Sequence, residues 1–276
     1  MWTGDVKNAR LLSMKIGVFD SGLGGLVIAK ALMQALPQYD YVYYGDTAHV
    51  PYGEKTPGRI LAYTLDAMRF LIAQNCGLII IACNTATAIT LRYLQKRFCP
   101  QFAPHVKILG VIIPTVEEAL KNGEKQIGVV GTPTTIHSDI YGVELKKISP
   151  PVQVVSLTTP RLVPAIEAND FKGAEQAITG YAETFQNIPA LILGCTHYPL
   201  VKDLFQKHLP NTRIIAQDEL MGQKLADYLK RHSEIETKLS QGKTRQFFVS
   251  QLSPTYIQVA QKLFPKIQLK IATLSR

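Results

Sequence analysis

The sequence has 276 residues, 46% of them hydrophobic, which is enough apolar material for two well-packed globular units and excludes a globally disordered chain. Its longest apolar stretches, near residues 77–82 and 108–114, fall far short of the roughly 18 residues that span a bilayer, so we expect no membrane segment. The formal net charge of +9 lies mostly in residues 201–276, where Lys and Arg at helical spacing without interleaved aromatic residues favour a solvated helix face over a nucleic-acid surface.

Residues 1–13 carry mixed charge and lack the apolar core of a secretory signal, so we interpret them as an N-terminal extension and expect a cytoplasmic protein. Met14 directly precedes the first predicted strand and is a candidate alternative start. The four cysteines are too few for a disulfide framework, and none lies at C-x-x-C spacing. This pattern predicts free thiols and no metal site.

Short apolar runs alternate with helix-like segments along the chain, which predicts an α/β fold. The predicted strands cover residues 15–20, 41–46, 78–83, 106–112, 126–132, 152–157, 190–195 and 212–216. Apolar residues recur at helical spacing in residues 25–36, 59–74, 115–121 and 174–185. Because the strands are apolar throughout, we expect mostly parallel sheets that are covered by helices on both faces.

Two cysteines lie in near-copies of one local pattern, in which an apolar strand ends in Cys and small polar residues follow. The first copy is IIIACNTATA at 79–88, and the second is ALILGCTHYPL at 190–200. If Cys83 and Cys195 belong to two similar sheets, the chain forms two lobes with the active site in the cleft between them. We predict crossovers near 100–105 and 210–217. The expected lobes are residues 14–105 plus 215–276, and residues 106–214.

A single cysteine at the end of a strand is usually inert, and Cys76 and Cys99 are interpreted in this way. Cys83 and Cys195 differ because each has polar neighbours and the two settings repeat. Backbone N–H groups at the start of a following helix would favour the thiolate form of each. The pair is therefore a candidate for acid/base chemistry.

Two ionisable residues lie close to these thiols or to the edge of their sheet. His197, two residues after Cys195, could accept the thiol proton as a neutral imidazole or stabilise the thiolate as an imidazolium. Asp20, at the end of the first predicted strand, could assist Cys83 in the same manner. Asp20 could equally cap the next helix, a role that Ser21 could also fill.

The run Ser-Gly-Leu-Gly-Gly at 21–25 suggests a dinucleotide-binding loop, but the spacing fails. A third glycine would fall at position 27, which is Val27, and the sequence has no GxxxxGK[ST] motif. The run could still present backbone N–H groups to an anion, and we expect a carboxylate there.

Two further polar segments could reach a ligand or serve only local structure. Tyr52 and Gly53 lie in residues 43–56, where the alternative is a plain β-turn around Pro51. In residues 131–141, Thr132, Thr135 and Ser138 could contact a ligand or act as helix caps. The sequence leaves both alternatives open.

Five motifs occur in order: FDSGLGG, YGDTAHVPYG, ACNTATA, GTPTTIHSDIY and GCTHYP. With them the chain closely resembles the cofactor-independent glutamate racemases from about residue 15 to 273. The resemblance implies two α/β lobes that enclose glutamate, a cytoplasmic enzyme without cofactor or metal, and a homodimer. It also implies that the product, D-glutamate, supplies peptidoglycan synthesis and so supports cell-wall formation and cell shape.

The resemblance implies that Cys83 and Cys195 are the two acid/base thiols. In the family, the thiol that matches Cys83 removes the α-proton of D-glutamate and the one that matches Cys195 removes that of L-glutamate. Glu167 matches a glutamate that assists His197, although Thr159-Pro160 stands where many relatives have Cys-Pro. The residues implied to surround the substrate are Asp20, Ser21, Tyr52, Gly53, Asn84, Thr85, Thr135, Thr196 and His197.

The chemistry of racemisation agrees with this resemblance. One proton must leave one face of the α-carbon and another must reach the opposite face, so two groups serve better than one. Without an electron sink, hydrogen-bond donors must meet the developing charge, and Asn84, Thr85 and Thr196 are suited to this role.

Two alternatives to a glutamate racemase stay open. The first is an aspartate or hydantoin racemase of the same superfamily. Aspartate racemases typically have Glu at the position of His197 and lack the opening Asp-Ser-Gly, so both features favour glutamate. The second, less favoured alternative is a secondary role in which the basic C-terminal region contacts nucleic acid or gyrase.

Overall fold

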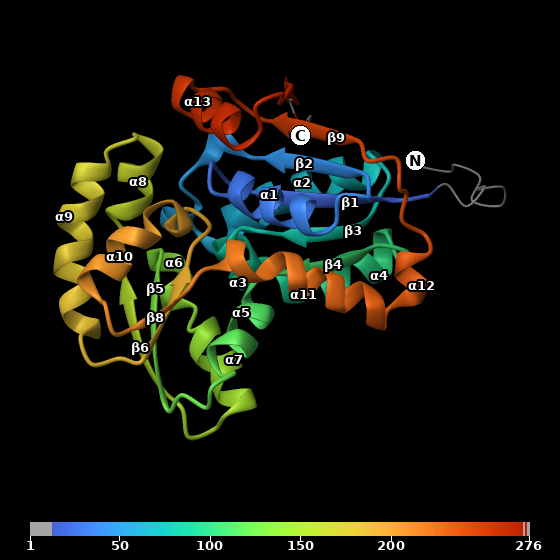
Figure 1. Ribbon diagram of the computed structural model, residues 1–276. Coiled ribbons are helices and arrows are strands. Elements are labelled where there is room, and N and C mark those ends of the chain that lie inside the picture. The colour runs from blue at the N-terminus through green and yellow to red at the C-terminus, as the bar shows by residue number, and fades with distance from the viewer. Residues whose placement is uncertain (1–12, 273, 275–276) are drawn as a thin grey trace.

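The computed structural model describes residues 13–272 and 274, and within these residues the strands form two separate sheets (Figure 1). All pairings between neighbouring strands of these sheets are parallel. The prediction of an α/β fold with two parallel sheets flanked by helices is confirmed. Residues 1–12 of the predicted N-terminal extension lie outside the described residues.

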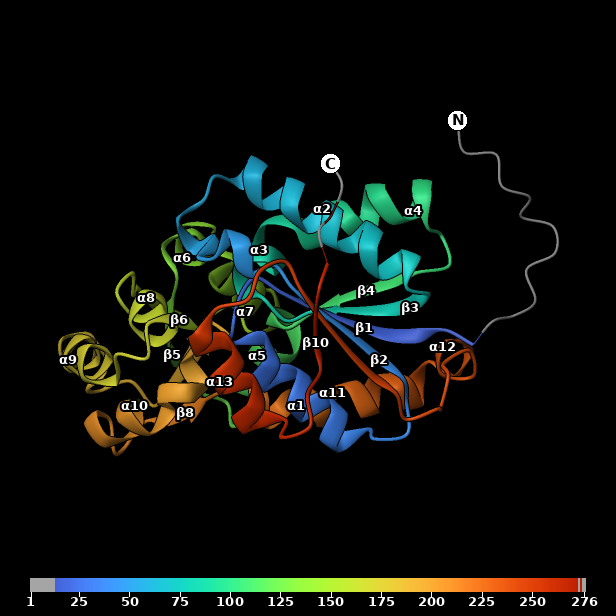
Figure 2. The same cartoon turned by 90° about the horizontal axis from the view of Figure 1, so that it is seen from above.

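The larger sheet has six strands in the order β10-β9-β2-β1-β3-β4. They are β1 (Lys15–Asp20), β2 (Tyr41–Gly45), β3 (Cys76–Ile81), β4 (Lys107–Gly110), β9 (Arg245–Val249) and β10 (Leu269–Ile271). Figure 2 shows α2, α3 and α4 on one face of this sheet and α1, α11 and α13 on the other. The helices of this lobe are α1 (Gly25–Ala35), α2 (Pro57–Ala73), α3 (Asn84–Tyr93), α4 (Cys99–Phe102), α11 (Gln217–Arg231), α12 (Ser233–Glu236) and α13 (Pro254–Leu263).

The smaller sheet has four strands in the order β6-β5-β7-β8. They are β5 (Gln126–Gly131), β6 (Gln153–Thr158), β7 (Ala190–Gly194) and β8 (Arg213–Ile215). One face packs on α8, α9 and α10, and α5 and α7 lie on the other side (Figure 1). The helices of this lobe are α5 (Ile112–Ala119), α6 (Pro133–His137), α7 (Ile140–Ile148), α8 (Leu162–Glu167), α9 (Phe171–Ala182) and α10 (Lys202–His208).

The structure corrects the predicted boundary between the lobes. β4 ends at Gly110, and α5 already begins at Ile112, so the predicted strand 106–112 is too long. β4 pairs with β3 and extends the first sheet, whereas a boundary at residue 106 assigns it to the second lobe. The apolar run continues past the strand because Ile112 is buried in the first turn of α5. Periodicity alone cannot separate a buried strand from a buried helix turn.

The C-terminal segment completes the first sheet, with β9 beside β2 and β10 beside β9. Neither strand was predicted from the sequence. β9 reads RQFFV with only two of its five residues buried, and β10 reads LKI with none buried, so both give weak apolar patterns. Helices α7 and α8 were also missed, and α10, α11 and α13 were anticipated only as Lys and Arg at helical spacing within residues 201–276.

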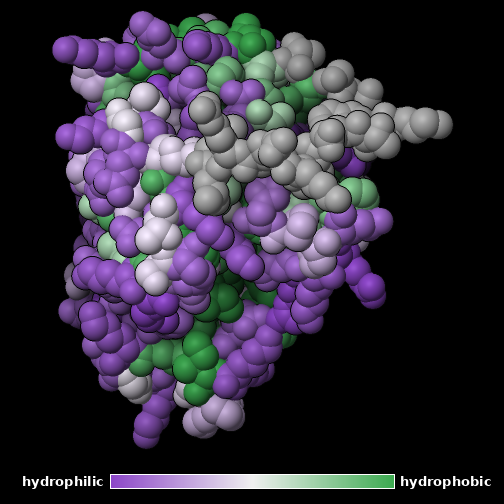
Figure 3. Space-filling view, turned by 90° about the vertical axis from the view of Figure 1, so that its right-hand side faces the viewer, coloured by the Kyte–Doolittle hydropathy of each residue, from purple (hydrophilic) through white to green (hydrophobic). Residues whose placement is uncertain are grey.

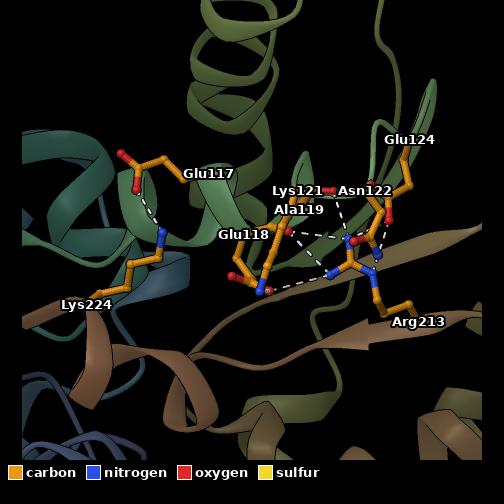
Figure 4. A network of polar contacts seen from close by, with 8 residues as sticks. All are labelled: Glu117, Glu118, Ala119, Lys121, Asn122, Glu124, Arg213 and Lys224. Atoms are coloured by element: carbon orange, nitrogen blue, oxygen red, sulfur yellow. Dashed lines mark hydrogen bonds and ion pairs between the residues drawn. The ribbon is translucent and has the colours of Figure 1, made fainter. Parts of the chain in front are cut away.

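The chain passes between the lobes twice, from β4 into α5 and from β8 into α11, and beside these passages lie one ion pair across the lobes and a set of Arg213 contacts within the second lobe (Figure 4). The Arg213 guanidinium on β8 donates to Glu124 Oε1 at 2.5 Å and to the carbonyl oxygen of Ala119 at 3.0 Å. Lys224 on α11 pairs with Glu117 on α5 at 2.9 Å and so links the two lobes directly. These contacts hold the side of the lobe boundary where the chain crosses.

One hydrophobic core runs through both lobes and includes Ile16 and Val18 of β1 together with Val129 of β5 and Ile192 of β7. The face of the molecule that carries α4 and α12 is mainly hydrophilic, with hydrophobic surface showing chiefly in a hollow in its lower half (Figure 3). None of the helices within residues 13–272 is long and apolar enough to cross a membrane.

Candidate active site

A small cavity lies where the carboxyl ends of β1, β3, β5 and β7 meet between the lobes. The structure brings most of the predicted site residues together around it. Those that line the cavity are Ser21, Tyr52, Gly53, Cys83, Asn84, Thr85, Cys195, Thr196 and His197. Three predicted residues, Asp20, Thr135 and Glu167, do not line it and instead contact residues that do.

Cys83 is 5% exposed and caps the start of α3, where its Sγ accepts a hydrogen bond from the Ala86 backbone N–H at 3.4 Å. The Ser21 hydroxyl lies 3.3 Å from the same sulfur. The N–H contact lowers the pKa of Cys83, as expected at a helix start, but burial has the larger effect on that pKa. Burial, together with the negative charge of Asp20, raises the pKa of Cys83 to about 12. Cys83 is therefore a neutral thiol near pH 7.

Cys195 follows β7 directly and begins a chain of polar contacts that ends on the other lobe. Its Sγ lies 3.6 Å from His197 Nδ1, and His197 Nε2 lies 2.6 Å from Glu167 Oε1. The same Glu167 oxygen accepts the backbone N–H of Leu23 at 2.9 Å. Both ring nitrogens of the imidazole therefore have partners, and these fix the orientation of the ring, as general acid–base catalysis requires.

Opposing effects act on the two ionisable partners of this chain. Burial by itself lowers the pKa of His197, but the contacts with Cys195 and Glu167 outweigh it and raise that pKa well above its usual value. Burial raises the pKa of Glu167, but the hydrogen bond and charge of His197 outweigh it and lower that pKa. The pair is therefore an imidazolium beside a carboxylate.

Asp20 is fully buried and does more than one task. Its Oδ2 accepts the N–H groups of Gly22 at 2.9 Å and Gly25 at 3.0 Å, so it caps the turn that leads into α1. Its Oδ1 accepts the Thr196 hydroxyl of the second lobe at 3.2 Å. Burial raises the pKa of Asp20 to about 6 against the lowering effects of His197 and these donors. Asp20 acts on Cys83 through its charge, and Ser21 makes the direct contact with that thiol.

Three buried threonines form a triangle of hydroxyls at the wall of the cavity. Thr85 Oγ1 lies 2.9 Å from Thr132 Oγ1 and 3.1 Å from Thr135 Oγ1, and the last two are 2.9 Å apart. Thr132 caps α6 and also lines the cavity, so it can serve as a helix cap and as a ligand contact at the same time. Thr135 supports Thr85 and Thr132 from behind.

Residues 46–56 form a loop that covers the cavity with Val50, Pro51, Tyr52 and Gly53. The loop is anchored by Asp46, which accepts the Tyr52 hydroxyl at 2.6 Å and contacts His49 Nδ1 at 2.8 Å. The hydroxyl of Thr134 in the second lobe donates to the Gly53 carbonyl oxygen at 2.8 Å. The loop therefore contributes to the closed state of the site.

Glycines permit the two lobes to approach this closely. A Cβ at Gly24 would lie 2.4 Å from the backbone carbon of Thr196 and 2.5 Å from the backbone nitrogen of His197. A Cβ at Gly53 would lie 2.4 Å from Thr132 Cβ. The glycine run at 21–25 thus serves lobe contact and supplies N–H groups to the carboxylates of Asp20 and Glu167.

Some residues around the site were not among those predicted from the sequence. Val163 lines the cavity from α8, while Tyr141 on α7 and Gln217 on α11 contact Asn84 from behind. Gln217 follows the end of β8, so the rule that ligands gather at strand ends could have found it. Within the described residues, no group of three or more His, Cys, Asp or Glu side chains is placed to bind a metal ion.

The contact with Glu167 gives a testable titration. In the folded protein the raised pKa of His197 keeps the imidazolium form into alkaline pH, and the imidazole becomes neutral as pH rises through that value. Glu167→Gln removes the carboxylate charge and should lower the pKa of His197. Titration of the ring by NMR checks this, with Glu236→Gln as a control because Glu236 pairs with Tyr39 away from the site. An unchanged His197 titration in Glu167→Gln would show that Glu167 does not control the imidazole.

Comparisons with known proteins show the family of the chain. The model of the Asp/Glu/Hydantoin racemase family matches residues 27–220. The chain is 33% identical over 252 residues to a glutamate racemase of Streptococcus sanguinis, covering 89% of this chain and 93% of that protein. It is 37% identical over 235 residues to a glutamate racemase of Ruegeria pomeroyi, covering 79% and 86%.

Among solved structures, the glutamate racemase of Francisella tularensis in complex with D-glutamate superposes with a TM-score of 0.84 at 34% identity, covering 95% of this chain and 98% of that chain. The resemblance to glutamate racemases that the five motifs indicated is thus confirmed. Because the family model matches more than half of the sequence, the chain belongs to the Asp/Glu/Hydantoin racemase family.

Proposed function

We propose that this protein interconverts L-glutamate and D-glutamate by proton transfer between the α-carbon and two thiols, without a cofactor. The observation that carries the proposal is that Cys83 of one lobe and Cys195 of the other line the same buried cavity. The similarity to glutamate racemases, one of them in complex with D-glutamate, supports the choice of substrate.

The proton balance requires one thiolate and one thiol. In the direction from L- to D-glutamate, the Cys195 thiolate takes the α-proton and becomes a thiol. The Cys83 thiol gives its proton to the opposite face of the α-carbon and becomes a thiolate. In the reverse direction the roles exchange, and between turnovers the two sulfurs regain their starting states by proton exchange with solvent.

The surroundings of the two sulfurs support this starting state. The pKa of Cys83 is raised to about 12 by burial and by Asp20, which suits a proton donor. Cys195 contacts His197, whose raised pKa keeps a positive charge beside the sulfur. Glu167 maintains that charge by accepting from the other ring nitrogen.

Charge that develops on the substrate must be met by donors that are already in place. Asn84, Thr85 and Thr196 line the cavity and are candidates for contacts with the substrate carboxylates. The pocket between the sulfurs has a volume of only about 20 Å³, enough for about one water molecule and too small for glutamate. Substrate entry therefore requires the lobes or the loop 46–56 to open, and closure then excludes water from the reacting atoms.

The use of the product and the oligomeric state belong to the same proposal. We infer that the D-glutamate is used in peptidoglycan synthesis and that the protein acts as a homodimer, because the motif resemblance implies both. Aspartate or hydantoin racemisation is the competing activity within the family. His197, beside Cys195, supports glutamate over aspartate, since aspartate racemases typically have Glu there.

The assay is racemisation of L-glutamate without added cofactor, followed by loss of optical rotation. We expect Cys83→Ser and Cys195→Ser each to lower kcat by about 10²- to 10⁴-fold, because a serine hydroxyl is a far weaker acid than a thiol and each group is one of two required proton carriers. Cys99→Ser, which alters a buried thiol away from the cavity, should retain turnover.

Two results would contradict the proposal. Near-normal turnover in either single variant would show that the two-thiol assignment is wrong. Racemisation of aspartate or a hydantoin in preference to glutamate would place the protein in another branch of its family.

Closure of the lobes is tested by Gly24→Ala. The added Cβ meets the backbone of Thr196 and His197, which cannot move aside as a flexible side chain could. We expect kcat/KM for glutamate to fall at least about tenfold, while the melting temperature changes little because the lobes can part slightly. Gly180→Ala on α9 is the matched control, since a Cβ there has nothing within 4 Å. Equal kcat/KM in both variants would show that close lobe contact is not needed.

A further inference from the structure

Gln217, which belongs to none of the five motifs, is fully buried behind the cavity. It is the first residue of α11, where the chain has just crossed from β8 back to the first lobe. Its side chain is hydrogen-bonded to Asn84 of the first lobe and to Thr115 and Tyr141 of the second. A buried amide is costly unless its donors and acceptor are paired, so this arrangement has a strongly preferred orientation.

Gln217 and Asn84 form a pair of reciprocal amide hydrogen bonds. Asn84 Nδ2 donates to Gln217 Oε1 at 2.8 Å, and Gln217 Nε2 donates to Asn84 Oδ1 at 2.8 Å. The Tyr141 hydroxyl donates to the same Asn84 Oδ1 at 2.6 Å. The Asn84 oxygen thus has two donors, and one Nδ2 proton is the remaining polar group of a side chain that lines the cavity.

An amide pair alone could exist in either of two orientations, since oxygen and nitrogen can exchange places in both partners. Thr115 removes this ambiguity. Its hydroxyl donates to the Val111 carbonyl oxygen at 2.7 Å, so the Thr115 oxygen can only accept. Gln217 Nε2 lies 3.3 Å from that oxygen and must be the donor. The backbone carbonyl of Val111, the residue that precedes α5, therefore sets the orientation of Gln217, and Gln217 sets that of Asn84.

We propose that Gln217 is a positioning residue that holds the Asn84 amide with its free N–H available to the cavity, so that Asn84 offers a donor to a substrate carboxylate. In the reversed orientation Asn84 would offer its oxygen, which repels a carboxylate. The identity of the carboxylate as that of glutamate rests on the proposed function, whereas the orientation of the amide does not.

The hydrogen bonding of Asn84 by Gln217 is tested first without any substrate. We expect the Asn84 side-chain amide, identified in the NMR spectrum by its loss in Asn84→Ala, to exchange slowly with solvent in the native protein. Gln217→Met keeps the length of the side chain but removes its hydrogen bonds, and should speed that exchange at least about tenfold. Gln223→Met on the exposed side of α11 is the matched control and should leave it unchanged. Equal exchange rates in the native protein and Gln217→Met would overturn the inference.

The consequence for binding is tested by a pH profile. Gln217→Glu introduces a carboxyl group that can donate to Asn84 Oδ1 only when protonated. The KM for glutamate should therefore be about tenfold above the native value at alkaline pH and should return toward it as pH falls. A role in packing alone predicts a KM that follows the native profile, and that outcome would contradict a positioning role.

A double-mutant cycle separates positioning from an independent effect. Gln217→Met should raise KM in the native background but have little further effect in Asn84→Ala, because the group it positions is gone. Equal effects in both backgrounds would overturn the inference. If the native protein does not racemise glutamate at all, the proposed function fails, while the exchange measurement still decides whether Gln217 holds the Asn84 amide.

Discussion

Burial at the contact between the lobes is the constraint on which the site depends. Two parallel sheets point their carboxyl ends at each other and enclose two thiols, a carboxyl group and an imidazole in one small volume. Burial raises the pKa of Cys83 to about 12 and that of Asp20 to about 6. His197 and Glu167 gain enough from their contact with each other to remain charged against this effect. The two sulfurs therefore sit in unequal electrostatic surroundings although their local sequences are alike.

The contacts that close the lobes are also the contacts that tune the ionisable groups. Glu167 of the second lobe accepts the Leu23 N–H of the first and orients His197 with the same oxygen. Thr196 of the second lobe donates to Asp20 of the first. Opening the cleft would break the Leu23–Glu167 and Thr196–Asp20 contacts and expose the buried groups to water, which would weaken the effect of burial on the pKa values of Cys83 and Asp20. The reactive state of the proposed mechanism is thus linked to closure.

The sequence was sufficient for the strand ends and for the residues that follow them. Parallel strands place such residues at one edge, so Cys83, Cys195 and His197 could be brought together before the structure was known. The sequence did not predict the contacts that are made across the lobes. The sequence left Asp20 open between assisting Cys83 and capping the next helix; its hydrogen bonds go to the glycine turn and Thr196, and Ser21 contacts the thiol.

Other misses have separate physical causes. The edge strands β9 and β10 have too few buried residues to show an apolar pattern. The boundary at residue 106 was placed one strand too early because residues 100–105 were interpreted as the crossover, whereas they form the end of α4 and its connection to β4 within the first lobe. Gln217 was missed because a glutamine at a helix start has no distinctive pattern, and its role depends on Asn84, 133 positions away in the sequence.

The central claim, that two thiols act on opposite faces of one carbon, is tested most directly by isotope exchange at early conversion. L-glutamate is incubated with the protein in deuterium oxide, and the α-hydrogen of both enantiomers is analysed before the reverse reaction becomes significant. Two separate proton carriers predict deuterium in the D-glutamate formed and protium in the L-glutamate that remains. D-glutamate that retains the protium of the substrate would show that a single group removes and returns the same proton, and would contradict the account.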